Sequence, residues 1–469
     1  MSDTELAFTP AWRMAELIRT KRLSPVELVD HLLDRIQALN PKLNAYLAVM
    51  ESEARKAAQA AETAVMEGAE LPPLHGVPVS IKDLYFVKGV PNTFGSLVYK
   101  EFVPDADSVV VERLRQAGAI ILGKTNTSEF GLSATTENRL GDDCRNPWNL
   151  KCTAGGSSGG AAAAVAAGLG PLAIGSDYGG SIRIPASFCG IFGLKPSHGR
   201  VPSHDCRRGM ELFGDIGPIA RTVRDGALLL SIIAGFDPRD PFTTRQSPPN
   251  LLEALDREVK GLRLAWSPDL GYARVNPEVR SIAERAALSF QSLGCLVEEV
   301  RPALGEFFPA YDLITLADQY AFNGHLLAGE ADKLMPYVKS ILEHGQRVTL
   351  AQYSQALRQI EHFRRRLADV FESYDLLLSP TTAVPAFPIG QRPRIIDGQE
   401  VSPVWGAFPL TAPFNISGWP AASVPCGFST QGLPIGLQIA GRWGEEATVL
   451  QVAAAWERIQ PWSEKLPSL

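Results

Sequence analysis

Two glycine-serine clusters lie close together in this chain of 469 residues, and the second ends in a serine that could act as a nucleophile. The first is Gly155-Gly156-Ser157-Ser158-Gly159-Gly160, and the second is Asp177-Tyr178-Gly179-Gly180-Ser181-Ile182-Arg183. Two glycines ahead of a serine permit a tight turn in which successive backbone N–H groups point into one small space. Such a concavity suits a tetrahedral oxyanion, so Ser181 could attack a carbonyl held there. Taken alone, the motif also fits an ordinary glycine turn.

The first cluster has two other interpretations. Composition alone would make it a flexible linker, but it lies between a strand-like run and the alanine-rich stretch Ala161 to Ala167, where a linker fits poorly. A phosphate-binding loop is excluded, because the Lys-Ser/Thr pair that should follow the glycines is missing.

A serine nucleophile requires a base, and no histidine pattern supplies one. The histidines, at positions 31, 75, 198, 204, 325, 344 and 362, form no familiar pairing, and the Gly-x-Ser-x-Gly elbow is absent. His75 and His198 lie in glycine turns and remain candidates for positions near the site. Lys82 follows the apolar run Val77 to Ile81, and burial there would lower its pKa and make a neutral amine available. In isolation, Lys82 also fits a solvated strand end.

Helical and strand-like patterns alternate around these motifs. Strands are expected near residues 77–81, 119–123 and 172–174, and helices near 109–116 and 161–167. This alternation predicts an α/β fold with a single large mixed, mostly parallel β-sheet covered by helices on both faces. Strand patterns resume at 261–266 and within 419–439, beyond a proline-rich linker candidate at 238–249. One continuous sheet is therefore favoured over two separable domains.

We accordingly expect one domain over residues 1–469. It would comprise N-terminal helices at about 5–70, a catalytic core at about 71–236, a helical insertion at about 305–375 and a C-terminal return to the core at about 376–469. The first clear helix is capped by Ser24, continues through Pro25 in its first turn and is expected to end at Asn40-Pro41. The insertion is rich in aromatic residues, which could either wall a pocket or shield the sheet.

Composition excludes several classes of protein. Hydrophobic residues make up 45% and charged residues 20% of the chain, and the net charge of −6 argues against a nucleic-acid-binding surface. No signal peptide or membrane-spanning stretch is evident, and six scattered cysteines without CxxC spacing are typical of a cytoplasmic protein with reduced thiols. No cluster has metal-ligand spacing, so neither a metal nor another cofactor is expected.

The sequence resembles the amidase signature family over nearly its whole length, most weakly between about 240 and 370. The motifs that carry the resemblance are, besides the two clusters with Gly175-Ser176 ahead of the second, His75-Gly76-Val77-Pro78, Ile81-Lys82-Asp83, Thr125-Asn126, Ser128-Glu129-Phe130-Gly131, Pro185-Ala186-Ser187-Phe188-Cys189-Gly190, Gly193-Leu194-Lys195-Pro196, Gly217-Pro218-Ile219-Ala220-Arg221, Asn415-Ile416-Ser417-Gly418-Trp419-Pro420-Ala421 and Gly432-Leu433-Pro434-Ile435-Gly436-Leu437-Gln438. The intervals between Lys82, Ser157 and Ser181 also match the family's Lys-Ser-Ser triad.

The resemblance implies a role for each of these residues. Ser181 would be the nucleophile, and Ser157, expected after a cis peptide bond from Gly156, would relay its proton to neutral Lys82. An oxyanion hole would be formed by the backbone N–H groups of Tyr178, Gly179, Gly180 and Ser181. Further residues would support the hydrogen-bond network or be purely structural, namely Ser158, Asp177 and Arg183. The family often has serine at the position of Ala161 and threonine at that of Tyr178, but the triad is intact, which indicates an active enzyme.

The implied activity is hydrolysis of a carboxamide C–N bond through an acyl-enzyme. The substrate would be a small molecule, an apolar, aryl or medium-chain amide, with esters or carbamates as further options, and the protein a monomer or homodimer. Pocket walls are expected from Phe130, Tyr178 and Phe213, with five more aromatic candidates at Phe307, Phe308, Tyr311, Trp405 and Phe414.

Two alternatives remain. One is the glutaminase component of a glutamyl-tRNA amidotransferase, its A chain, which the stretch Arg207 to Asp215 and the aromatic insertion disfavour. The other is a non-catalytic binding scaffold, because a fold does not by itself establish activity.

Overall fold

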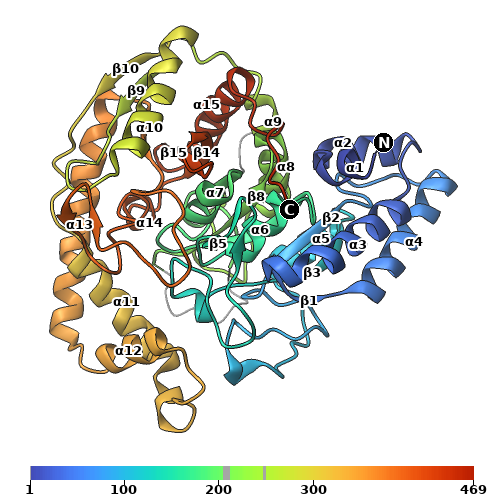
Figure 1. The fold of residues 1–469 in the computed structure, drawn as a ribbon, viewed down its shortest axis with the longest axis horizontal. Helices are drawn as coiled ribbons and strands as arrows, with labels where there is room; N and C mark the ends of the chain where they lie inside the picture. Colours follow the sequence, from blue (N-terminus) through green and yellow to red (C-terminus); the bar gives the residue numbers. More distant parts are fainter. Residues whose placement is uncertain (1, 204–211, 247–249) are drawn as a thin grey trace.

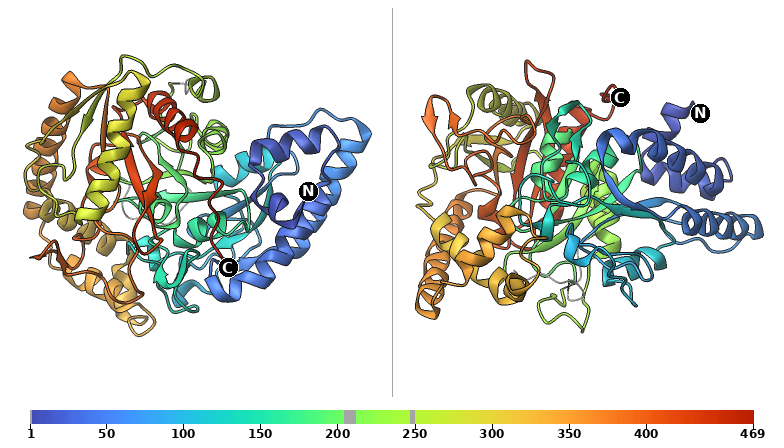
Figure 2. Two further views of the ribbon diagram at one scale, coloured as in Figure 1. Left: turned by 45° about the horizontal axis from the view of Figure 1, so that its top comes forward. Right: turned by 60° about the horizontal axis from the view of Figure 1, so that its bottom comes forward.

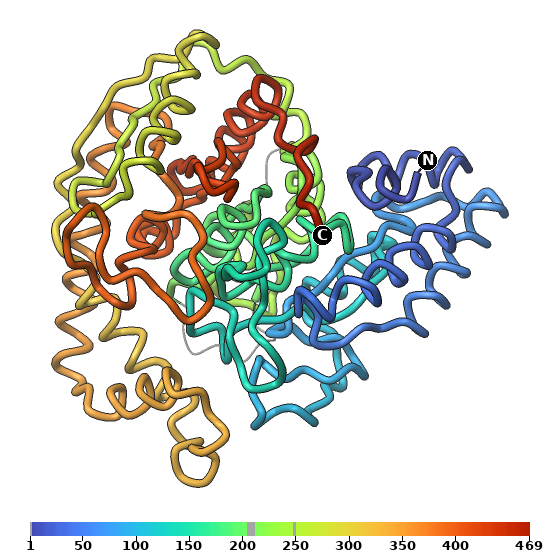
Figure 3. Tube along the Cα trace, in the orientation of Figure 1, coloured from blue at the N-terminus to red at the C-terminus, as the bar shows by residue number. Residues whose placement is uncertain are grey.

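The computed structural model describes residues 2–203, 212–246 and 250–469 (Figures 1 and 3). Its centre is one eleven-stranded sheet that runs through both halves of the chain, as expected. In spatial order the strands are β1 (Tyr46–Val49), β3 (Ile120–Thr125), β2 (Pro78–Lys82), β6 (Leu172–Asp177), β8 (Asp215–Ala220), β7 (Phe192–Lys195), β14 (Ala421–Phe428), β15 (Pro434–Ala440), β11 (Leu376–Pro380), β9 (Arg263–Trp266) and β10 (Leu296–Glu299).

The sheet is mixed, but parallel pairing is less extensive than the sequence suggested. Parallel ladders occur in the blocks β3–β2–β6 and β11–β9–β10. The remaining ladders of this sheet are antiparallel, including the long hairpin β14–β15 and the pairing of β6 with β8. The expectation of a mostly parallel sheet is corrected on this point, because strand direction depends on long-range pairing that helix-strand alternation does not encode.

Helices cover both faces of the central strands. Every residue of β2, β3, β6, β8 and β15 is buried, whichever face its side chain occupies. Successive side chains of a strand point to opposite faces, so burial of all of them requires cover on both sides. The covering helices are α5 (Val109–Gln116), α6 (Gly159–Ala166), α7 (Arg183–Cys189), α8 (Val223–Ile233), α9 (Leu251–Ala254), α10 (Pro277–Ser289), α14 (Ala412–Ile416) and α15 (Glu446–Ile459).

The N-terminal helices lie beyond the β1 edge of the sheet, on the opposite side of the molecule from the helices of the insertion (Figures 1 and 2). They are α1 (Asp3–Phe8), α2 (Ala11–Arg19), α3 (Pro25–Leu43) and α4 (Glu51–Glu67). Ser24 caps α3 as expected, accepting hydrogen bonds from the N–H groups of Val26 and Glu27. The predicted end at Asn40-Pro41 is wrong: the helix continues through Pro41 and ends where Asn44 adopts a left-handed conformation. A proline this close to the last turn removes one N–H, and the Asn44 N–H still bonds to Asn40 O.

Residues 305–375 are mainly helical, as expected, with α11 (Phe308–Asn323), α12 (Pro336–Gly345) and α13 (Leu350–Ser373). Two small hairpins complete the structure, β4 (Arg145–Asn146) with β5 (Asn149–Thr153) and β12 (Ile395–Ile396) with β13 (Gln399–Glu400). Part of the linker candidate 238–249 and most of the stretch from Arg207 lie outside the described residues. In the described part of the chain, no helix combines the length and apolarity needed to cross a membrane.

Candidate active site

Lys82 and the serines around it meet at one edge of the sheet. Lys82 ends β2 and Ser176 lies near the end of β6, and these two strands are parallel neighbours, so both residues point from the same edge. Ser157 and Ser158 come directly before α6, whose first turn packs close to these strands. The Lys82 Nζ atom lies 2.6 Å from Ser157 Oγ, 2.8 Å from Ser158 Oγ and 2.8 Å from Ser176 Oγ.

Burial sets the protonation of this amine. The Lys82 side chain is completely buried, and this burial lowers its pKa well below the ordinary value, while the Asp177 carboxylate opposes part of the shift. A cation removed from water is destabilised relative to the neutral amine. The surroundings of Nζ are hydroxyl groups that carry no charge. The site therefore favours a neutral amine that can accept a proton.

Ser157 is held by a specific loop conformation. The Gly156-Ser157 peptide bond is cis, as the resemblance implied. Thr136 supports the loop, donating through its hydroxyl to Gly155 O at 2.8 Å and accepting from the Gly159 N–H at 3.1 Å. A Cβ at Gly156 would approach the backbone of Thr135 to 2.6 Å, so only glycine fits there. The glycines of the first cluster thus pack a structured loop and do not form a linker.

Ser181 lies in the turn between β6 and α7, and Asp177 organises this turn. The Asp177 carboxylate accepts hydrogen bonds from the N–H groups of Gly180 at 2.7 Å and Ile182 at 3.1 Å, and pairs with the Arg183 guanidinium at 2.8 Å. Burial alone would raise the pKa of Asp177, but Arg183 outweighs burial and holds the pKa below its ordinary value. The ion pair is completely buried, so Asp177 and Arg183 position the nucleophile turn rather than face a substrate.

The backbone of the turn fixes which amides can face a substrate. The Tyr178 carbonyl accepts from the Tyr311 hydroxyl at 2.7 Å, and the Gly179 carbonyl accepts from the Thr411 hydroxyl at 2.5 Å. In a trans peptide the N–H points away from the carbonyl, so the bond to the Tyr178 carbonyl directs the Gly179 N–H away from Tyr311. Among the described residues, the N–H groups of Gly179 and Ser181 have no hydrogen-bond partner.

Gly180 departs from the predicted oxyanion hole. Its N–H already donates to the Asp177 carboxylate, so it is engaged within the protein. Gly180 has a φ of 127°, and a Cβ there would collide with the Thr411 side chain, which explains the glycine without a role for its N–H. The amides that could bind an oxyanion are therefore those of Gly179 and Ser181.

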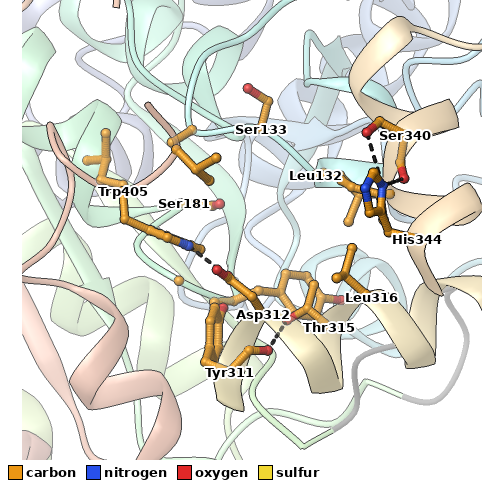
Figure 4. A pocket seen from close by; sticks show the side chains of 17 residues that line it. Leu132, Ser133, Ser181, Tyr311, Asp312, Thr315, Leu316, Ser340, His344 and Trp405 are labelled. Carbon is orange, nitrogen blue, oxygen red and sulfur yellow. Dashed lines mark hydrogen bonds between the residues drawn. The ribbon is translucent and has the colours of Figure 1, made fainter. Parts of the chain in front are cut away.

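Ser181 opens onto a cavity of about 330 Å³ (Figure 4). The cavity is bounded by residues 131–134, by the nucleophile turn, by Trp405 and by the insertion helices α11 and α12. Its walls include the side chains of Leu132, Ile184, Leu316, Ile341 and Val404, together with the rings of Tyr178, Tyr311 and Trp405. The insertion thus forms part of the pocket wall.

Tyr178 lines the cavity, but Phe130 and Phe213 do not. Phe130 turns toward Tyr99, with ring centroids 6.0 Å apart, and joins a separate apolar cluster. Phe213 is buried behind the wall, packed on the Tyr311 ring at 5.2 Å. The pocket prediction is corrected for these two phenylalanines, because the direction of an aromatic side chain depends on packing between distant segments.

The relation between the two serines is looser than that between Ser157 and Lys82. The Ser158 N–H donates to Ser181 O at 3.1 Å, which joins the two loops. The Ser181 hydroxyl itself has no hydrogen-bond partner among the residues that the structure describes. It is directed to the cavity, as a nucleophile awaiting a substrate would be.

Sequence reasoning missed several residues of the site. Ser176 contacts Lys82, Thr411 and Asn415 hold the nucleophile turn, and Asp312 and His344 line the cavity. Ser176 is adjacent to Asp177 and alternation along β6 could have indicated it, whereas the others lie in distant segments. The two candidate histidines lie elsewhere: His75 contacts Ala61 O, and His198 contacts Asp215.

Comparison with known proteins identifies the family. The family model described as Amidase matches residues 27–450. An acylamidase from Rhodococcus erythropolis is 38% identical over 486 residues, covering 100% of this chain and 99% of that protein. The glutamyl-tRNA(Gln) amidotransferase of Moorella thermoacetica has an A component that is also 38% identical, with 99% of both chains covered. The solved structure of a bacterial aryl acylamidase of the amidase signature family matches with a TM-score of 0.93 at 33% identity, covering 97% of each chain. The chain belongs to the amidase signature family and is an amidase-type hydrolase.

Proposed function

We propose that this protein hydrolyses apolar amides, with an aryl or medium-chain substituent, through an acyl-enzyme on Ser181. The observation that carries the proposal is the cavity onto which Ser181 opens, because its walls are mainly aliphatic and aromatic. An apolar group gains free energy when it leaves water for such walls, whereas a polar group buried there without partners is penalised. The acylamidase names of two relatives agree with this substrate class.

Lys82 acts as the base through Ser157. A neutral amine has two N–H donors and one lone pair, and three hydroxyl groups surround Nζ. The Ser158 hydroxyl donates to Ser176 O at 3.2 Å, so it accepts from Lys82. With Ser176 accepting the second N–H, the lone pair is left for the hydroxyl proton of Ser157.

The reaction then follows from these positions. The Ser181 hydroxyl turns to Ser157 when substrate binds, and its Oγ attacks the carbonyl carbon while its proton moves to Ser157 Oγ and the Ser157 proton moves to Lys82 Nζ. The oxyanion accepts from the N–H groups of Gly179 and Ser181. Lys82 returns the proton through Ser157 to the leaving nitrogen as the C–N bond breaks. Water attacks the ester by the same route and releases the acid.

A substrate panel tests the proposal. We expect kcat/KM for hexanoyl anilide to exceed that for glutamine by at least about a hundredfold, because glutamine would leave polar groups unpaired in an apolar cavity. The panel includes the matching alkyl amide, ester and carbamate, and product release is followed by chromatography. Higher activity with glutamine, or co-purification with a second protein chain, would favour the glutaminase component of an amidotransferase. Failure of wild-type protein to react with a fluorophosphonate would favour a non-catalytic scaffold.

Tyr311→Phe tests how the oxyanion hole is positioned. The change removes the hydroxyl that fixes the Tyr178 carbonyl and hence the direction of the Gly179 N–H. We expect kcat to fall by about three- to thirtyfold with a smaller change in KM, since an oxyanion contact strengthens in the transition state. Steady-state kinetics measure both constants. The control is Tyr353→Phe, whose hydroxyl contacts Asp318 away from the cavity. An unchanged kcat in Tyr311→Phe, or an equal loss in both variants, would contradict the assignment.

A further inference from the structure

A carboxylate lies in the wall of this otherwise mainly apolar cavity. Asp312, on α11, is the only Asp or Glu among the described residues that line it. Its Oδ1 accepts a hydrogen bond from Trp405 Nε1 at 2.7 Å, and Figure 4 shows the indole nitrogen directed at this carboxyl. The proposed hydrolysis assigns nucleophile, relay, base and oxyanion donors to other residues. Asp312 is therefore a charged group that the chemistry of bond cleavage does not require.

Aromatic rings surround this carboxylate on the substrate side. The Trp405 ring stacks on Phe308 with centroids 5.2 Å apart, and the Tyr311 ring meets Trp405 edge-on at 5.5 Å. Both Trp405 and Tyr311 line the cavity next to Asp312. Aromatic faces attract cations, and a carboxylate beside them adds a full opposite charge. The combination has the composition of a site for an ammonium group.

The carboxylate is incompletely satisfied within the protein. The Trp405 N–H bonds to Oδ1, and in the described part of the chain Oδ2 has no hydrogen-bond donor. Burial raises the pKa of Asp312 to about 6, with the indole N–H opposing part of the rise, so above this pH an anion lies in surroundings that destabilise it. A bound cation or N–H donor would relieve that penalty.

The carboxylate also lies within reach of a substrate attached at Ser181. The Cη2 edge of the Trp405 ring is 3.1 Å from the point that a Cβ on Gly179 would occupy, and the Nε1 side of the same ring bonds to Asp312. One indole ring therefore separates the nucleophile turn from the carboxylate. A group at Asp312 would be a short chain or one aryl ring away from the scissile carbonyl.

We propose that Asp312, with the Trp405 and Tyr311 rings, binds a protonated amine of the substrate, so that the preferred substrates are apolar amides carrying a cationic amino group near the scissile bond. This inference rests on the proposed amide hydrolysis and specifies its substrate class. Asp312 acts as a specificity-determining residue and takes no part in bond cleavage.

Two pairs of nearly isosteric substrates test the charge preference. One pair places the amine on the leaving group, para-(aminomethyl)acetanilide against para-ethylacetanilide. The other places it on the acyl group, the anilide of ω-aminohexanoic acid against that of heptanoic acid. At about pH 8, where Asp312 is ionised and alkyl amines are protonated, we expect wild type to favour the cationic member of at least one pair by about ten- to a hundredfold in kcat/KM. No preference for the cation in either pair would overturn the proposal.

Asp312→Asn separates a charge role from a structural one. The amide oxygen of asparagine still accepts the Trp405 N–H, so the ring stays in place while the charge is lost. We expect the preference for the cation to disappear and kcat/KM for the neutral member to stay within about threefold of wild type. The control is Asp318→Asn, the same change on the same helix at a position that does not line the cavity. Equal losses with both members of a pair would reduce Asp312 to a support for Trp405 and overturn the proposal.

A binding measurement keeps this inference separate from the proposed function. Phenylpropylammonium is titrated into wild type, Asp312→Asn and Ser181→Ala by calorimetry at the same pH. We expect binding to wild type and to Ser181→Ala and about tenfold weaker binding to Asp312→Asn. Binding with this pattern in a protein that hydrolyses no anilide would reject the proposed function and retain the ammonium site. Equal affinity for wild type and Asp312→Asn, or no binding at all, would reject the site.

Discussion

Ser181→Ala lowers kcat/KM for an anilide by at least about four orders of magnitude while the protein stays folded. The variant lacks the atom that forms the acyl-enzyme, and no neighbouring hydroxyl is placed to replace it: Ser157 and Ser158 both contact Lys82 and are buried below the cavity. Only the binding of the oxyanion by the backbone amides remains. Hydrolysis rates measured at high enzyme concentration test this loss.

Stability provides the matched readout for this variant. The Ser181 hydroxyl has no hydrogen-bond partner among the described residues, so its removal leaves no buried polar group unpaired. We expect the free energy of unfolding to change by less than about 0.5 kcal/mol. A fluorophosphonate should label wild type and leave Ser181→Ala unlabelled. Turnover within about a hundredfold of wild type in the folded variant would refute Ser181 as the nucleophile.

Lys82→Met lowers kcat/KM by about three orders of magnitude or more, because the relay loses its proton acceptor. Methionine has similar length and no basic group, so the loss reports on the amine and not on an empty space. In wild type, the active form is the neutral amine, so kcat/KM rises with pH through the lowered pKa of Lys82 and levels off above it. A pH-rate profile measures this rise. A double variant with Ser181→Ala should be little worse than either single variant, since both act in one step.

The same substitution changes how stability depends on pH. The native pKa of Lys82 is lowered, so between that pKa and the ordinary lysine value the unfolded chain binds one proton more than the native protein. The free energy of unfolding of wild type therefore gains about 1.4 kcal/mol per pH unit across this window, and Lys82→Met lacks this contribution. Urea denaturation at several pH values measures the difference. Parallel pH dependences for the two proteins would show that Lys82 stays protonated in the native state.

The sequence alone was enough to identify the reacting groups. The glycines that permit the loop of Ser157 and the turn of Ser181 are local features, and the apolar run before Lys82 marks a buried strand. Each of these signals is contained in a few adjacent residues, because backbone conformation at a turn and burial along a strand both depend on local side chains. The α/β alternation followed in the same way.

Only the tertiary structure decided the direction of strand pairing, the use of the Gly180 amide and the walls of the cavity. Asp177 binds Gly180 through a turn that Arg183 and Asn415 hold, and Asn415 comes from the far end of the chain. Asp312 faces the nucleophile through contact between α11 and the segment of Trp405. Such contacts join residues far apart in sequence, and no periodicity or spacing records which of them will meet, because long-range packing selects the partners.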